Sequence, residues 1–135
     1  MTSSLITALR VEENKRLAFL PKHFGKLIGI AERRIYDTLR GLSHNYTGGF
    51  WDFYELSNNG FYMAPNLDEK LEIFVVGNQY EGILSGDAAG ILACLYVTYD
   101  LSVLYESERL LVQYGLLLEF AEQHNEATAI FKAMD

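Results

Sequence analysis

The sequence has one cysteine and two prolines among its 135 residues, and its apolar stretches are short. A single cysteine excludes an internal disulfide and a cysteine-based zinc site. The longest apolar stretch, Ala88 to Tyr99, is too short to span a bilayer. Residues 1–16 lack the basic start, long apolar region and cleavage site of a signal peptide. These absences predict a soluble protein of the cytoplasm without a membrane partner.

The chain does contain enough apolar material for a core. Half of its residues are apolar by a broad count, and they include eight phenylalanines, nine tyrosines and one tryptophan. Such a composition excludes a disordered chain. A chain of this length forms one ordinary domain, which we expect to cover residues 1–135 and to need no disulfide or metal for stability.

Charge is distributed unevenly along the chain, whose net charge is −7. Residues 1–44 hold eight basic and four acidic side chains, giving +4, whereas residues 45–135 hold three basic and 14 acidic ones, giving −11. Nucleic-acid binding through counterion release requires clustered Lys and Arg, so we expect no direct nucleic-acid binding. Two interpretations of the split remain. The segments present two electrostatic faces to charged partners, or they pack together and neutralise each other.

The first third of the chain predicts an extended segment and two helices. Residues 5–11 alternate loosely in polarity, which suits an extended segment. Pro21 suits the first position of a short helix that Gly25 ends. Apolar residues then recur every three or four positions and predict an amphipathic helix. They are Ile28, Ala31, Ile35, Leu39 and Leu42.

The middle of the chain predicts strands. Residues 50–56 and 61–64 are rich in aromatic residues, and the turn sequence Ser57-Asn58-Asn59-Gly60 between them predicts a β-hairpin. Its register stays open, because a two-residue turn at Asn59-Gly60 and a four-residue loop over residues 57–60 pair different residues. Residues 71–76 and 80–84 are expected to add two more strands. The aromatic hairpin either is buried on both faces or displays one face for recognition.

The last third of the chain predicts helices. Ser85 suits a helix N-cap, and the apolar residues that follow it lie on nearly every side, as in a buried central helix. Further helices are expected over residues 107–124 and near residues 127–131. Because strands are grouped rather than alternating with helices, the predicted class is α+β. We expect a small antiparallel sheet with a central aromatic hairpin, packed against about four helices.

No arrangement typical of a catalytic centre is visible in the sequence. Cys94 lies in the most apolar segment, opposite to the setting that a reactive thiolate needs. His23, His44 and His124 show no i, i+4 spacing, so a metal site is not expected. Glu55 lies among aromatic residues without an identifiable partner. A hydrolase or nuclease that uses His23 or Glu55 stays as an alternative, beside a small adaptor protein that binds through the aromatic hairpin.

Three segments carry recognisable sequence blocks: Phe19–Gly25 (FLPKHFG), Gly48–Pro65 (GGFWDFYELSNNGFYMAP) and Leu84–Ile91 (LSGDAAGI). They resemble the signature blocks of the ArdB/KlcA antirestriction family. The resemblance covers nearly the whole chain, and the second block is long enough to be highly specific. Two small departures are Asn59, where many relatives have glycine, and Gly86 at a variable position. Asn59 keeps a residue that suits a turn.

The resemblance implies a compact α+β protein of plasmids, prophages or genomic islands that protects incoming DNA from type I restriction–modification enzymes of the bacterial host. It implies no cofactor and no catalytic activity, so we expect inhibition of the restriction enzyme, directly or through an intermediary. The expected oligomeric state is a monomer by default. Acidic residues occur at most in pairs, such as Asp68-Glu69, whereas DNA carries about one charge per 1.7 Å of axis. Recognition by a specific surface is therefore favoured over mimicry of DNA.

Polar residues within these blocks are the candidates for contact with a partner, namely His23, Glu55, Asn58, Tyr62 and Asp87. The C-terminal residue Asp135 adds two carboxylates to the end of the last helix, where they oppose the helix dipole. This end is expected to fray and to be available for contact. The alternative is that the polar residues of the blocks form a buried network, which ties the hairpin to two helices. No catalytic, cofactor-binding or metal-binding residue is assigned.

Overall fold

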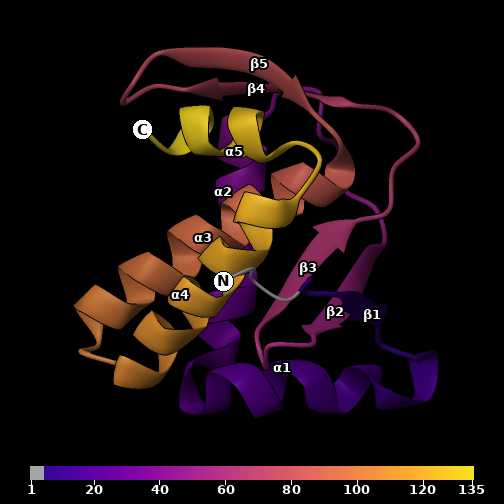
Figure 1. Ribbon diagram of the computed structural model, residues 1–135, viewed down its shortest axis with the longest axis vertical. Coiled ribbons are helices and arrows are strands. Elements are labelled where there is room, and N and C mark those ends of the chain that lie inside the picture. Colours follow the sequence, from indigo (N-terminus) through magenta and orange to yellow (C-terminus); the bar gives the residue numbers. More distant parts are fainter. Residues whose placement is uncertain (1–4) are drawn as a thin grey trace.

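The computed structural model of the protein describes residues 5–135 and confirms the α+β class (Figure 1). The strands are β1 (Ala8–Arg10), β2 (Trp51–Leu56), β3 (Phe61–Pro65), β4 (Leu71–Val75) and β5 (Tyr80–Leu84). The helices are α1 (Arg16–Phe24), α2 (Ile28–Leu42), α3 (Gly86–Leu104), α4 (Glu108–Gln123) and α5 (Ala127–Met134). Short 3₁₀ turns, Glu13–Lys15 and Gly25–Leu27, precede and follow α1. All strand pairing is antiparallel, as predicted.

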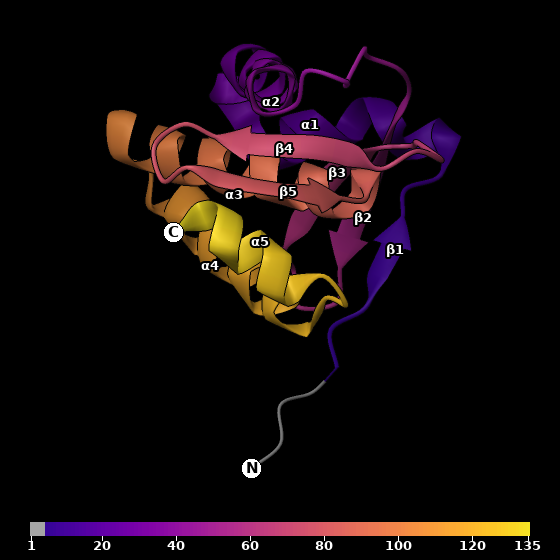
Figure 2. The ribbon, with the colours of Figure 1, turned by 90° about the horizontal axis from the view of Figure 1, so that it is seen from above.

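The strands divide between two sheets, where one was expected. The first sheet has the order β1-β2-β3, and the second pairs β4 with β5. The first sheet does not continue beyond β3, because α3 packs against that strand. The β4–β5 pair instead lies across α3, with α5 beside it (Figure 2). Asn78, in the turn of this pair, donates from Nδ2 to the carbonyl of Ala133 in α5 at 2.8 Å.

The central hairpin closes through a three-residue loop, which differs from both registers considered from the sequence. Glu55 pairs with Phe61, and the Leu56 N–H donates to the Gly60 carbonyl at 2.9 Å. The Asn59 N–H donates to the Leu56 carbonyl at 3.0 Å, and Asn59 itself adopts a φ of 75°. A tight turn followed by one left-handed residue is a common hairpin connection, and asparagine tolerates that conformation. The hairpin was therefore predicted correctly, but its loop length was not.

Helix α1 begins at Arg16, so the prediction that Pro21 opens this helix is wrong. Pro21 lies inside the helix, where its missing N–H leaves the Leu17 carbonyl without a helical donor. Leu17 is exposed, so water reaches this side of the helix. Gly25 ends α1 as predicted: it adopts a φ of 53°, and its N–H donates to the Pro21 carbonyl.

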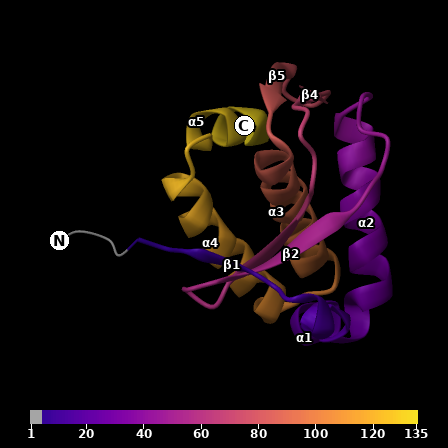
Figure 3. The same cartoon turned by 90° about the vertical axis from the view of Figure 1, so that its right-hand side faces the viewer.

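Helix α3 is the buried central helix, as predicted. Ser85 caps its first turn by accepting a hydrogen bond from the Ala88 N–H at 3.1 Å. Helices α2 and α4 pack on either side of it (Figure 3). The helix extends to Leu104, so its 19 residues are long and apolar enough to cross a membrane, contrary to the sequence-based estimate of its length. Because 67% of the apolar window is buried inside the protein, α3 is a core helix.

The aromatic hairpin belongs to the core. Trp51, Phe53, Phe61 and Tyr62 are buried, and Tyr54 is partly buried. Helix α1 covers one face of the sheet, where Phe19 stacks on Phe53 with ring centroids 4.7 Å apart. On the other face Tyr54 stacks on Tyr62 at 4.7 Å, and Tyr62 stacks on Phe120 of α4 at 5.5 Å. The hairpin therefore does not display the aromatic face that an adaptor would need.

Candidate functional site

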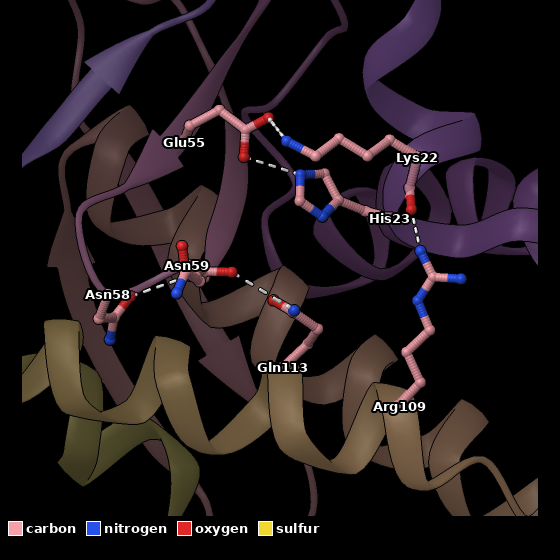
Figure 4. A network of polar contacts seen from close by, with 8 residues as sticks. Lys22, His23, Glu55, Asn58, Asn59, Arg109 and Gln113 are labelled. Atoms are coloured by element: carbon pink, nitrogen blue, oxygen red, sulfur yellow. Dashed lines mark hydrogen bonds and ion pairs between the residues drawn. The ribbon is translucent and has the colours of Figure 1, made fainter.

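The first polar group joins α1 to β2 (Figure 4). His23 lies in the last turn of α1, and its Nε2 is 2.8 Å from Oε1 of Glu55. Lys22, its neighbour in the chain, donates from Nζ to Oε2 of the same carboxylate at 3.0 Å. The structure thus brings together two of the predicted residues, His23 and Glu55. The sequence did not reveal this pairing, because the two residues lie 32 positions apart.

His23 is buried although it is polar. Its ring stacks on Phe61 with centroids 4.0 Å apart and meets Phe19 edge-on at 4.8 Å. Burial lowers the pKa of His23 below its ordinary value of 6.5, although the Glu55 carboxylate and its hydrogen bond act in the opposite direction. The neutral imidazole is therefore favoured, and it donates to Glu55. This contact anchors α1 to the hairpin.

The second polar group ties the turn of the hairpin to α4. Asn58 donates from Nδ2 to the Leu116 carbonyl at 2.9 Å, and its Oδ1 accepts the Gly60 N–H at 2.9 Å. One amide side chain therefore both shapes the turn and attaches it to a helix. Gln113 donates to the Asn59 carbonyl at 3.4 Å (Figure 4).

A shallow hollow of about 340 Å³ lies between these two groups. Its lining includes Lys22, His23, Glu55, Arg109 and Gln113. The guanidinium of Arg109 donates to the Lys22 carbonyl, which connects α4 with the end of α1 (Figure 4). Within the described residues 5–135, Oε1 of Gln113 is buried and accepts no hydrogen bond. The two cationic side chains of the hollow, Lys22 and Arg109, already have partners within the fold.

The third polar group surrounds Asp87 in the first turn of α3. Tyr62 donates from its hydroxyl to Oδ1 at 2.7 Å, and Nε2 of His124 lies 2.8 Å from Oδ2. The Glu126 N–H donates to Nδ1 of His124 at 2.9 Å, so the imidazole proton is on Nε2 and points to Asp87. Burial raises the pKa of Tyr62, and the Asp87 carboxylate raises it further, so the phenol stays protonated and donates.

The same group of residues also holds the N-terminal cap of α3. The Glu126 carboxylate accepts the Ser85 N–H at 2.9 Å and the Ser85 hydroxyl, so the cap of α3 is joined to the start of α5. His124 and Glu126 were not predicted. No sequence pattern links them with Asp87 or Ser85, because only the packing of the last helices brings them near.

The remaining predicted residue, Asp135, is exposed and directly follows α5. Its N–H donates to the Phe131 carbonyl at 3.2 Å. A further buried carboxylate is that of Asp52 on β2. Its Oδ1 lies 3.5 Å from a guanidinium nitrogen of Arg10 on the neighbouring strand, without hydrogen-bond geometry. This pair joins the basic N-terminal segment to the acidic part of the chain.

Most of the predicted polar residues therefore hold the hairpin to helices. His23 and Glu55 attach it to α1, Asn58 attaches it to α4, and Tyr62 with Asp87 attaches it to α3. This geometry agrees with the interpretation of a polar network. Glu55 and Asp87 keep part of their carboxylates at the surface, with side-chain exposures of 32% and 39%.

The single cysteine takes no part in these groups. Cys94 is fully buried in α3, its thiol points to the Met63 carbonyl, and burial raises the pKa of the thiol to about 12. Throughout residues 5–135, no group of three or more His, Cys, Asp or Glu side chains is placed to hold a metal ion. The groups around His23 and Asp87 each offer two such side chains in contact.

Comparison with known proteins identifies the family. Residues 44–135 match the model of a family described as antirestriction protein. This chain belongs to the antirestriction protein family. An antirestriction protein KlcA of Escherichia coli is 44% identical over 135 residues, covering 96% of this chain and 95% of its own length. The uncharacterised protein YafX of E. coli K12 is 33% identical, covering 96% of this chain and 88% of its own.

A solved structure has the same fold. It superposes with a TM-score of 0.91 at 41% sequence identity, covering 100% of this chain and 99% of the other. The work on that structure describes KlcA and ArdB as having a novel fold and antirestriction activity against type I DNA restriction systems in vivo but not in vitro. The family resemblance and the fold class predicted from the sequence are thereby confirmed.

Proposed function

We propose that this antirestriction protein acts in the cell against type I DNA restriction systems. One observation carries the proposal: a solved KlcA/ArdB structure with that activity matches the full length of this chain at 41% identity. The protein would thereby protect incoming plasmid or phage DNA from the host's restriction endonuclease. We infer that residues 1–135 act as one domain, as a monomer in the bacterial cytoplasm.

The mechanism that we propose is non-catalytic and needs no cofactor. The only thiol is buried with a raised pKa, which is the opposite of a nucleophile's setting. The imidazole of His23 is covered by Phe19 and Phe61, and its partner Glu55 is already held by Lys22. A buried imidazole that is already paired with a carboxylate supports a structural role better than the hydrolase or nuclease alternative.

The partner that we propose is a type I restriction–modification enzyme or an intermediary of it. The solved relatives act in vivo but not in vitro, which favours a mechanism that requires a further component of the cell. We propose that contact does not involve DNA directly, because the acidic segment of this chain repels phosphates. Of the six predicted residues, Glu55, Asp87 and Asp135 expose carboxylates for contact, while His23, Asn58 and Tyr62 position the hairpin.

The proposal is tested by plating unmodified phage on hosts with different type I systems, with and without this protein. Protection predicts a rise in plating efficiency on at least one type I host. A host with an unrelated class of restriction enzyme, and one with no restriction enzyme, control for general effects on phage growth. Unchanged plating on every type I host, with the folded protein present in the cells, would refute the proposed function.

A further inference from the structure

The turn between α3 and α4 exposes large apolar side chains at one end of the molecule, the lower left of Figure 1. We call these residues the tip patch, and they are Tyr99, Val103, Leu104, Tyr105, Leu111 and Val112. Val103 is 61% exposed and Val112 60%. Apolar side chains that gather at a surface, rather than occurring singly, are typical of a site for another macromolecule.

The tip patch is continuous across the two helices. Tyr99 and Val103 are four residues apart on α3, so they lie on the same face of that helix. Leu111 and Tyr114 share a face of α4 in the same way. The rings of Tyr99 and Tyr114 have centroids 5.2 Å apart, which joins the two faces. Tyr99 and Val103 on α3 therefore form one surface with Leu111 and Tyr114 on α4.

The turn itself contains an unusual residue. Glu106 adopts a φ of 49°, a left-handed conformation that disfavours side chains and is commonly filled by glycine after a helix. The Ser107 N–H donates to the Ser102 carbonyl at 2.9 Å, as in the usual closing motif of a helix. The glutamate therefore places a charge at the outermost turn although glycine would suit the backbone better. Such an outlier is informative about function when it accompanies an exposed surface.

Acidic residues border the tip patch. Asp100, Glu106 and Glu108 are exposed, and within residues 5–135 none of them forms an ion pair. The basic residue in this segment is Arg109, whose guanidinium donates to the Lys22 carbonyl on the side facing α1. A surface that is apolar in the middle and acidic at the rim complements one that is apolar with a basic rim.

We propose that the tip patch docks against a protein surface in which Lys and Arg surround an apolar hollow, and that this surface belongs to the restriction machinery. This inference rests on the proposed function. The acidic rim repels DNA phosphates and anionic lipid headgroups, which disfavours a nucleic acid or a membrane as the occupant. A second copy docked tip to tip would bring the same acids together, so self-association through this surface is also disfavoured.

The test uses single substitutions that add one positive charge to exposed valines. Val103→Lys disrupts the tip patch and keeps a good helix former in α3. Val76→Lys is the matched control, because Val76 is 78% exposed in the turn between β4 and β5. We expect Val103→Lys to reduce protection of phage by about tenfold or more, as at a binding hot spot, and Val76→Lys to leave it unchanged. Equal protection by both variants, at equal abundance and thermal stability, would overturn the proposal.

A second measurement does not depend on protection. A photoreactive benzoyl-phenylalanine is placed at position 103 or at position 76 of the full chain, and restricting cells are illuminated. We expect crosslinks from position 103, and not from position 76, to a protein subunit of the restriction system. Crosslinks to nucleic acid, crosslinks to a second copy of this chain or equal crosslinking at both positions would overturn the proposal. If the wild-type chain fails to protect phage, the proposed function is refuted, and the crosslinks alone decide the role of the tip patch.

Discussion

The contact between α3 and β3 gives the sharpest prediction of stability. Gly90 lies in the buried part of α3, directly against β3. A Cβ at this position would lie 2.4 Å from Cβ of Ala64, 2.5 Å from its Cα and 2.5 Å from the Met63 carbonyl oxygen. Two of these three atoms belong to the backbone of the strand, so no side-chain rotation relieves the overlap. The substitution Gly90→Ala must therefore move the helix away from the sheet.

The expected magnitude follows from two opposing effects. Overfilling a packed core costs about 1–3 kcal/mol. Replacing glycine by alanine inside a helix stabilises it by about 0.5–1 kcal/mol. Because the overlap involves backbone atoms of β3, the upper part of the first range applies, and we expect Gly90→Ala to lower the free energy of unfolding by about 1–2 kcal/mol.

Gly115→Ala is the matched control, since it makes the same change inside α4. An added Cβ there would meet no atom within 4 Å, so this variant is expected to gain about 0.5–1 kcal/mol. Urea unfolding followed by far-ultraviolet circular dichroism and by Trp51 fluorescence measures both variants. If Gly90→Ala proves as stable as the wild type, or if the two variants shift the midpoint equally, the description of the α3–β3 contact is wrong.

Two further predictions concern buried titratable groups. Burial lowers the pKa of His23 from its ordinary value of 6.5, so below about pH 6.5 the unfolded chain binds more protons than the folded one and stability falls as the pH falls. The free energy of unfolding of His23→Gln, measured by urea unfolding from pH 7.5 to 5.5, should therefore fall less steeply than that of the wild type, and equal slopes would contradict this reasoning. Burial also raises the pKa of the Cys94 thiol to about 12. At pH 8 we expect a thiol reagent to react with Cys94 only after unfolding in urea, and stoichiometric reaction of the native protein would show that the core is open at α3.

Local sequence signals predicted much of the fold. The apolar repeat of α2 places Ala31, Ile35 and Leu39 in the core, and the Ser85 cap marks the start of α3. These signals work because they concern neighbours in the chain. The prediction that Pro21 opens α1 was wrong, because the 3₁₀ turn before Arg16 begins the helical region earlier. The division into two sheets was also missed, because it depends on α3 packing against β3, which no local pattern expresses.

The polar residues, too, were predicted only in part from the sequence. Tyr62, Asp87, His23 and Glu55 were singled out as polar residues within apolar blocks, and the structure pairs them with each other. Their other partners, Lys22 and His124, were missed, as was Glu126, which holds His124 and Ser85. His124 and Glu126 lie in the last helical region and reach Asp87 and Ser85 through packing alone. Chemistry thus identified residues with a polar role, whereas the nature of that role depended on distances between remote segments.

The uneven charge of the chain now has a more specific interpretation. Ion pairs cross between the basic and acidic segments, such as Arg10 with Asp52 at 3.5 Å and Lys22 with Glu55 at 3.0 Å, so the segments neutralise each other where they meet. Asp87 and Glu126 are likewise engaged with internal partners. The unpaired negative charge at the surface is therefore smaller than the charge of −11 over residues 45–135 suggests. At the α3–α4 turn the exposed acidic residues border apolar side chains instead of forming a regular row. This arrangement argues for recognition of a particular protein surface rather than imitation of the DNA backbone.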